Sequence, residues 1–360
     1  MKLSRTLILA AFATMFIMNA QAEPRYHVIP IISGYAQGIN DQGDVVGAMA
    51  DVGTFPGPVI AGHAFLYTNG NANKKATFTD LGVYNSPLPR QYQYKGTIAY
   101  GINNSGIIVG QATDLEEWDA STAIVDAFMY KNGKLSIIAE GSLDGGETAT
   151  CTAINNRGDV VGGLDILTFL HEYYGAEQAF LYSNGIVTPL GTLGASTVLA
   201  ETYSYATSIN NAGQIVGVSS NGVPNGYNGF LWMNGKMHAI GSPSFRPNAI
   251  NDNGWIVGSD SSGAVLYVYG LTIKLGAGEA VSLNNSGVVV GNFGERGNPT
   301  GGFIYFGRMY DLNTLVDGGW KITEVGQIND AGQIAATGTK PGSAVTYALL
   351  LTPNLNLLKF

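Results

Sequence analysis

Ile39-Asn40-Asp41-Gln42-Gly43-Asp44-Val45-Val46-Gly47 is a nine-residue stretch that returns six more times along this chain of 360 residues. We call it the turn motif. Its other copies begin at Ile102, Ile154, Ile209, Ile250, Leu283 and Ile328, and only the last departs at its end, with Ala336 in place of the final glycine. Recurrence at such intervals is typical of a repeat protein, in which each copy supplies one structural unit.

Each copy of the turn motif predicts a β-hairpin. An apolar residue ends one strand, and Asn-Asn or Asn-Asp opens the turn with side-chain hydrogen bonds to the backbone. A glycine then supplies the left-handed backbone conformation before a second apolar pair begins the returning strand. Each copy is therefore expected to contribute two antiparallel strands.

A second, looser motif follows each turn motif and is clearest at Ala64-Phe65-Leu66-Tyr67 with Asn69-Gly70. It recurs with its Asn-Gly pair at residues 126–133, 178–185 and 228–235, and keeps only the apolar pattern at 263–267, 302–305 and 347–350. Asn-Gly between apolar runs is a strong hairpin signal. Each unit is thus predicted to hold four antiparallel strands.

Successive turn motifs begin 63, 52, 55, 41, 33 and 45 residues apart, and four-stranded units of about 40 to 50 residues are typical of propeller blades. We predict an all-β fold, a seven-bladed β-propeller of four-stranded antiparallel blades. No fourth strand follows residues 347–351, whereas residues 26–31 form a spare strand, so we expect the N-terminal strand to pair with the last blade and close the ring. A solenoid is the alternative, but it would need terminal caps that the sequence does not show.

Together the two motifs resemble the HAF-type extracellular repeat of secreted bacterial proteins, over essentially the whole chain after residue 22. The resemblance implies secretion and a β-propeller-like fold, and it brings no catalytic residues with it. The histidine of that repeat is present here only at His63, since the matching positions hold Asp126, Gln178, Asn228 and Gly263. This variation argues against a repeated metal or catalytic role for the position.

The first 22 residues are typical of an export signal. Lys2 and Arg5 give a positively charged start, residues 7–18 are apolar, and Ala20-Gln21-Ala22 forms a small-residue cleavage site. A membrane anchor is the alternative, but the apolar run is too short for it. We therefore expect residues 1–22 to be a signal peptide, residues 23–360 to form a single β-propeller domain, and the protein to be secreted to the periplasm or the extracellular space.

Charge and composition narrow the range of partners. Without residues 1–22, the chain keeps 16 of its 18 basic residues and all 26 acidic ones, a net charge of −10. This charge disfavours nucleic acid, and no further apolar stretch or basic run indicates a membrane. Glycine is about twice as frequent as usual and charged residues about half as frequent, which suits short strands and tight turns. We expect a monomer with neither a nucleic-acid nor a membrane partner.

Several chemistries find little support. Cys151 is the single cysteine, so it cannot form an internal disulfide, and we expect it to be a buried apolar residue. The four histidines lie far apart, which disfavours zinc, and neither a phosphate-binding glycine loop nor a Gly-x-Ser-x-Gly motif is present. We expect no cofactor. Calcium stays open, because Asp114, Glu116, Glu117 and Asp119 offer oxygen ligands at a spacing that matches no known loop.

Long insertions point to one face of the ring. Because antiparallel strands alternate in direction, the turn motifs and the Asn-Gly turns must lie on one face and all other connections on the opposite face. The long insertions belong to the second set and to the first four units, at residues 48–62, 83–99, 111–125, 163–177, 192–206 and 218–227. We expect this long-loop face to bind the ligand, since scaffolds carry function on variable loops.

The long loops are rich in aromatic and acidic side chains, which suit sugars and protein partners equally well. The candidate ligand-binding residues are Tyr84, Arg90, Tyr94, Glu117, Trp118, His171, Glu172, Tyr173, Tyr174, Glu201 and Tyr205. The plainer interpretation is that these rings only pack the loops onto the propeller.

We favour a protein that binds an extracellular carbohydrate or protein ligand through the long-loop face of blades one to four, without catalysis and with no catalytic or metal-ligating residue assigned. The alternative is a secreted carbohydrate-active enzyme, a hydrolase or lyase, that uses loop carboxylates such as Asp114, Glu117, Glu172 and Glu201. A purely structural component would not need so uneven a set of insertions. Two carboxylates facing each other across a pocket would favour the enzyme, and a shallow platform of exposed rings would favour binding.

Overall fold

The structure is a computed structural model that describes residues 26–50, 62–70, 74–84, 94–115, 124–140, 148–166, 176–194, 203–223 and 226–354. Within these ranges the fold is all-β apart from one short 3-10 helix, η3 (Leu312–Thr314). No helix in these ranges is long and apolar enough to cross a membrane. The predicted signal peptide and the larger part of the long insertions lie outside the described residues.

The strands form antiparallel sheets of two sizes. Five sheets have four strands each, joined in chain order. They comprise β5 (Tyr94–Ile102), β6 (Ile108–Leu115), β7 (Ile124–Lys131) and β8 (Lys134–Ala139); β9 (Ala149–Ile154), β10 (Val160–Ile166), β11 (Ala176–Ser183) and β12 (Ile186–Pro189); β13 (Ser204–Ile209), β14 (Ile215–Ser220), β15 (Tyr227–Met233) and β16 (Lys236–Ile240); β17 (Arg246–Ile250), β18 (Ile256–Asp260), β19 (Gly263–Val268) and β20 (Leu271–Gly276); and β21 (Glu279–Leu283), β22 (Val289–Glu295), β23 (Asn298–Tyr305) and β24 (Met309–Asp311).

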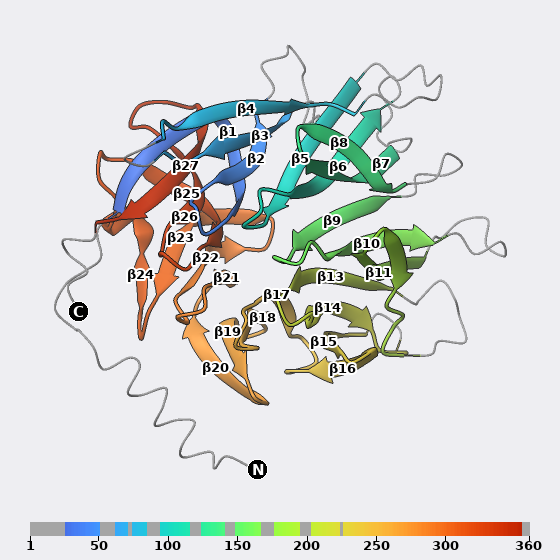
Figure 1. The fold of residues 1–360 in the computed structure, drawn as a ribbon. Coiled ribbons are helices and arrows are strands. Elements are labelled where there is room, and N and C mark those ends of the chain that lie inside the picture. The colour runs from blue at the N-terminus through green and yellow to red at the C-terminus, as the bar shows by residue number, and fades with distance from the viewer. Residues whose placement is uncertain are drawn as a thin grey trace.

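A sixth sheet of seven strands joins the two ends of the chain. Its order is β25 (Lys321–Ile328), β26 (Ile334–Thr339), β27 (Thr346–Pro353), β1 (Tyr26–Ile39), β2 (Val45–Met49), β3 (Ala64–Thr68) and β4 (Thr77–Gly82). The sheets stand around a central axis in chain order, as in a propeller (Figure 1). The predicted all-β fold and the four-stranded antiparallel units are therefore confirmed.

Strand β1 belongs to both ends because its two halves pair with different strands. The first half pairs with β27, from Tyr26 opposite Pro353 to Ser33 opposite Tyr347. The second half pairs with β2, from Gly34 opposite Met49 onward. Gly34 lies between the halves at φ 150°, and a Cβ there would lie 2.2 Å from the Ala48 carbonyl oxygen, so the change of partner requires glycine. The predicted pairing of the N-terminal strand with the C-terminal hairpin is confirmed.

The start of β1 is also held by the segment that follows η3. The Tyr26 amide donates to the Leu315 carbonyl at 2.8 Å, and the Asp317 amide donates to the Tyr26 carbonyl at 3.0 Å. The Asp317 carboxylate accepts from the Val28 amide at 3.0 Å and lies 2.7 Å from His27 Nδ1. Partial burial acts to raise the pKa of Asp317, but the hydrogen bonds from His27 and Val28 outweigh it and lower that pKa. The start of β1 is thus held by β27 and by the segment that follows η3.

Phenylalanines of the second motif fill the space between neighbouring sheets. Phe65, Phe128, Phe180, Phe230 and Phe303 are all fully buried. The cluster around Phe180 joins Val109 and Ala127 of one sheet to Cys151 and Val160 of the next. Cys151 has no exposed surface, which confirms its predicted burial, and this burial raises the pKa of its thiol.

The innermost strands carry a β-bulge two residues before the turn motif. The bulged residues, which have no partner in the register of the neighbouring strand, are Gln37, Tyr100, Thr152, Thr207, Asn248 and Val281. The final glycine of each turn motif faces this bulge, where a Cβ would lie 1.8–2.2 Å from a carbonyl oxygen of the bulged strand. Strand β25 has a second register shift between Val325 and Ile328, and Ala336 lies opposite Val325. This different register accounts for the one copy that ends in alanine.

Candidate functional site: the central channel

Two cavities lie along the central axis. The cavity at the turn-motif end has a volume of about 250 Å³, and the cavity at the opposite end has a volume of about 510 Å³. Both are lined by Ala153, Ser208, Ala249, Ser282 and Gln327. They are therefore the two ends of one channel, and we call them the turn-face cavity and the loop-face cavity.

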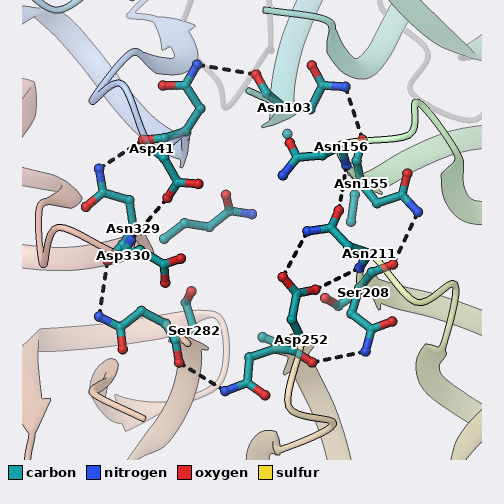
Figure 2. Close-up of a pocket in the computed structure, with 18 of the residues that line it drawn as sticks. Asp41, Asn103, Asn155, Asn156, Ser208, Asn211, Asp252, Ser282, Asn329 and Asp330 are labelled. Carbon is teal, nitrogen blue, oxygen red and sulfur yellow. Dashed lines mark hydrogen bonds between the residues drawn. The ribbon is translucent and has the colours of Figure 1, made fainter. Parts of the chain in front are cut away.

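A closed circle of asparagines surrounds the turn-face cavity (Figure 2). The Nδ2 of each first asparagine of a turn motif donates to the backbone carbonyl of the same asparagine in the next copy, at 2.9–3.3 Å. The circle runs through Asn40, Asn103, Asn155, Asn210, Asn251, Asn284 and Asn329, and the bond from Asn329 to Asn40, at 2.9 Å, closes it. All seven turn motifs are therefore joined around one axis.

A second circle lies beside the first. The backbone amide of the next residue in each turn motif donates to the side-chain oxygen of its counterpart in the following copy, at 2.8–3.2 Å. The residues are Asp41, Asn104, Asn156, Asn211, Asp252, Asn285 and Asp330. In both circles, polar groups that line the turn-face cavity therefore bond to one another across neighbouring copies of the turn motif.

The loop-face cavity is lined by the bulged residues of the innermost strands. A bulge turns a side chain away from the regular alternation of its strand, and here it directs Gln37, Tyr100, Thr152, Thr207, Asn248 and Val281 to the channel. Thr152 and Thr207 also donate to carbonyls of the neighbouring sheet, at 2.8 Å and 3.0 Å. In contrast, Gln37 and Tyr100, and also Gln111 of β6, make no side-chain hydrogen bond to any other described residue.

The hairpin between β22 and β23 closes one side of the loop-face cavity. Residues 294–297 and Pro299 line it, and Arg296 carries the cation of this hairpin. Arg296 Nη1 lies 3.2 Å from Glu279 Oε1, and Glu279 Oε1 also accepts from Asn248 Nδ2 at 2.8 Å. Glu279 is therefore paired with a cation and hydrogen-bonded.

Glu324 and two tyrosines complete the lining. Glu324 is partly buried, and burial raises the pKa of its carboxyl. None of the described residues donates a hydrogen bond to its side chain or forms an ion pair with it. Burial also raises the pKa of Tyr100 to about 12 and that of Tyr205 further, with the charge of Glu177 contributing at Tyr205. Both phenols keep their protons at neutral pH and can donate to a ligand.

The structure places only some of the sequence-predicted site residues. Tyr205 lines the loop-face cavity, whereas Tyr84 packs partly buried against the core cluster of Val46 and Leu81. Tyr94 is the first residue of β5, and its side chain lies outside the described part of the chain. Outside it too lie Arg90, Glu117, Trp118, His171, Glu172, Tyr173, Tyr174 and Glu201, and with them most of the possible calcium cluster.

A further aromatic group lies at the same face, where Arg246 and Tyr227 interact electrostatically with Tyr203. The Arg246 guanidinium stands 4.0 Å above the Tyr227 ring, and Arg246 Nε donates to the Tyr227 hydroxyl at 3.0 Å.

Within the described ranges, no group of three or more His, Cys, Asp or Glu side chains is placed to hold a metal ion.

Of the residues that line the loop-face cavity, sequence reasoning named Tyr205 and missed the others. The signal was present in the residue two before each turn motif, which is Gln37, Tyr100, Thr152, Thr207, Asn248, Val281 or Gly326, while the residues around it repeat. A position that varies inside a repeated pattern is free of the packing that fixes its neighbours. The hairpin at residues 294–299 was missed because the sixth unit carries no long insertion.

The comparisons with known proteins give a family match over part of the chain. The model of a family described as "Protein of unknown function (DUF3466)" matches residues 30–193. The predicted membership of the HAF-type repeat family is therefore wrong. Its motifs are short, and their Asn and Gly residues are what any tight hairpin of this geometry needs. No curated protein matches the chain.

Solved structures resemble the chain at low identity. The acylaminoacyl peptidase of Pyrococcus horikoshii is 11% identical with a TM-score of 0.47, over 88% of this chain and 51% of that one. The β-propeller domain of the Trilobed protease from Pyrococcus furiosus is 11% identical with a TM-score of 0.34, over 78% and 97%. Bacillus subtilis arabinanase Arb43A is 10% identical with a TM-score of 0.34, over 94% and 96%. The chain spans about half the length of the peptidase, and these values carry no functional argument.

Proposed function

We propose that this protein is a secreted seven-bladed β-propeller that binds an extracellular carbohydrate in its loop-face cavity, without catalysis. The two closed circles of seven turn motifs support the blade number, with the seven-stranded sheet counted as two blades that share β1. The signal-like residues 1–22 support secretion. Trp118, His171 and Tyr174 of the long insertions stay candidate ligand-binding residues outside the described part of the chain.

The observation that carries the proposal is the polar lining of the loop-face cavity. Its volume of about 510 Å³ lies in the range of small-molecule sites. Gln37, Gln111 and Tyr100 have hydrogen-bonding groups that no other described residue engages, and Tyr205 adds a second ring. Amides and hydroxyls match sugar hydroxyls, and tyrosine rings match the apolar faces of sugars.

The test is a glycan array probed with the protein, followed by calorimetric titration of the ligand that it identifies. Tyr100→Phe and Gln111→Ala are each expected to weaken binding by about 10-fold, since each removes roughly one hydrogen bond to the ligand. Tyr269→Phe is the matched control, because Tyr269 is 69% exposed in the turn between β19 and β20, away from the channel. A ligand that binds all three variants as tightly as the unchanged protein would contradict the site.

A carbohydrate-active enzyme is the second candidate, and one observation favours it. Glu279 and Glu324 occupy equivalent positions on the neighbouring strands β21 and β25 and line the same cavity. Glu279 is paired with Arg296, whereas burial raises the pKa of Glu324, and a carboxyl with a raised pKa can act as a proton donor. The test is whether the protein releases new reducing ends from the ligand that the array identifies. Release by the unchanged protein and no release by Glu324→Gln would show that the protein is an enzyme and does not only bind the sugar.

A further inference from the structure

The loop-face cavity carries an excess of negative charge. Glu279, Glu295 and Glu324 line it, and Arg296 is the one cation among the described residues that do so. Arg296 forms an ion pair with Glu279, so its positive charge neutralises the Glu279 carboxylate. Two carboxylates in the cavity therefore lack a cationic partner within the described part of the chain. This distribution disfavours acidic ligands such as uronic acids or sulfated sugars, because like charges repel at close range.

Of the two carboxylates without a cationic partner, Glu324 is the one more removed from water. It lies on the innermost strand β25, its solvent exposure is intermediate, and burial is the cause of its raised pKa. Glu295, by comparison, is exposed at the tip of the β22–β23 hairpin, where water can solvate it. Removing a carboxylate from water costs free energy unless a cation or several donors replace the water. A ligand that brings a cation would meet this requirement, whereas a neutral hydroxyl would meet it only in part.

We propose that the ligand carries a protonated amine beside its hydroxyl groups, as an amino sugar does, and that its ammonium group pairs with the Glu324 carboxylate. This inference rests on the proposed carbohydrate-binding function and names the sugar class. The rings of Tyr100 and Tyr205 line the same cavity, and their faces attract a nearby cation as well as the apolar face of a sugar. The free amides of Gln37 and Gln111 bind the hydroxyls.

The experiment compares three tetrasaccharides by calorimetric titration at pH 6, where the amine is protonated: a glucosamine oligomer, its fully N-acetylated form, and a glucose oligomer with the same linkage. The glucosamine oligomer is expected to bind about 10-fold or more tightly than the other two, as a charge-assisted contact is stronger than a neutral one. Glu324→Gln keeps the side-chain shape and is expected to remove this preference. Glu140→Gln is the matched control, because Glu140 is exposed at the end of the outer strand β8.

The outcomes separate this inference from the proposed function. Equal binding of the three oligomers, or a preference that survives in Glu324→Gln, overturns the amine contact while the carbohydrate site stands. Binding of a neutral or acidic sugar from the array, with no binding of the glucosamine oligomer, also overturns it. An array on which no sugar binds overturns the proposed function itself. A thermal melt of Glu324→Gln that matches the unchanged protein shows that the comparison is made on folded protein.

Discussion

Replacing Phe180 with alanine is expected to lower the free energy of unfolding by about 3–5 kcal/mol, the range for deleting a fully buried phenyl ring. Phe180 has no exposed surface and joins the β5–β8 sheet to the β9–β12 sheet. Its neighbours include Ala127, Ala149 and Cys151, which are too small to fill the space that the ring leaves. Urea unfolding monitored by fluorescence measures this loss of stability. The slope of the unfolding free energy against urea concentration is expected to stay unchanged.

Phe78→Ala is the matched control for this prediction. Phe78 lies on the outer strand β4, is 41% exposed, and stacks on Phe65 at a centroid distance of 5.7 Å. Its removal is expected to cost less than about 1 kcal/mol, since an exposed ring loses little on truncation. Equal losses in the two variants would mean that the sheets do not pack through the phenylalanines of the second motif.

Replacing Asn155 with alanine is expected to cost about 3 kcal/mol, because a buried donor or acceptor left unpaired costs roughly 1–3 kcal/mol. Asn155 is 4% exposed. The Oδ1 atom accepts from the amides of Arg157 and Asp159, both at 3.0 Å, and so shapes its own turn. The Nδ2 atom donates to the Asn210 carbonyl at 3.2 Å and to the Asp159 carboxylate at 3.0 Å. One substitution therefore weakens a turn and opens the circle of first asparagines.

Asn156→Ala supplies the control for the asparagine circle. Asn156 follows Asn155 directly but is exposed, and its Oδ1 accepts from the Asn104 amide at 2.9 Å. Water can replace this acceptor, so a loss below about 1 kcal/mol is expected in the same urea titration. If Asn155→Ala cost no more than Asn156→Ala, the circle of first asparagines would not contribute to stability.

The strands and their order could be predicted from the sequence because their signals are local. Asn103 and Gly106 define a turn within a few residues, and the apolar residues Ile102 and Ile108 end and begin the strands on either side. The pairing of β1 with β27 followed from a count of strands, since one end lacked a strand and the other had one to spare.

The site was harder to predict because it depends on contacts between strands. Tyr100 enters the channel through a bulge, and that bulge fits only because Gly110 on the neighbouring strand leaves room for the Ile98 carbonyl. No local sequence pattern around Tyr100 predicts this contact. Glu324 and Arg296 line the loop-face cavity but belong to units without long insertions. The expectation that the ligand binds at the long insertions therefore did not include them.

Disulfide formation between β1 and β27 tests most directly whether the chain closes into a ring around one channel. His27 lies opposite Thr352, and paired residues of antiparallel strands have Cα atoms about 4.5–5.5 Å apart, within reach of a disulfide. The variant His27→Cys/Thr352→Cys is expected to form an internal crosslink on mild oxidation and to migrate faster on a non-reducing gel. Cys151 is fully buried and does not compete. The control His27→Cys/Val345→Cys, whose second site precedes β27, is expected to stay uncrosslinked. Absence of the crosslink in the first variant, or equal crosslinking in both, would contradict the closed ring.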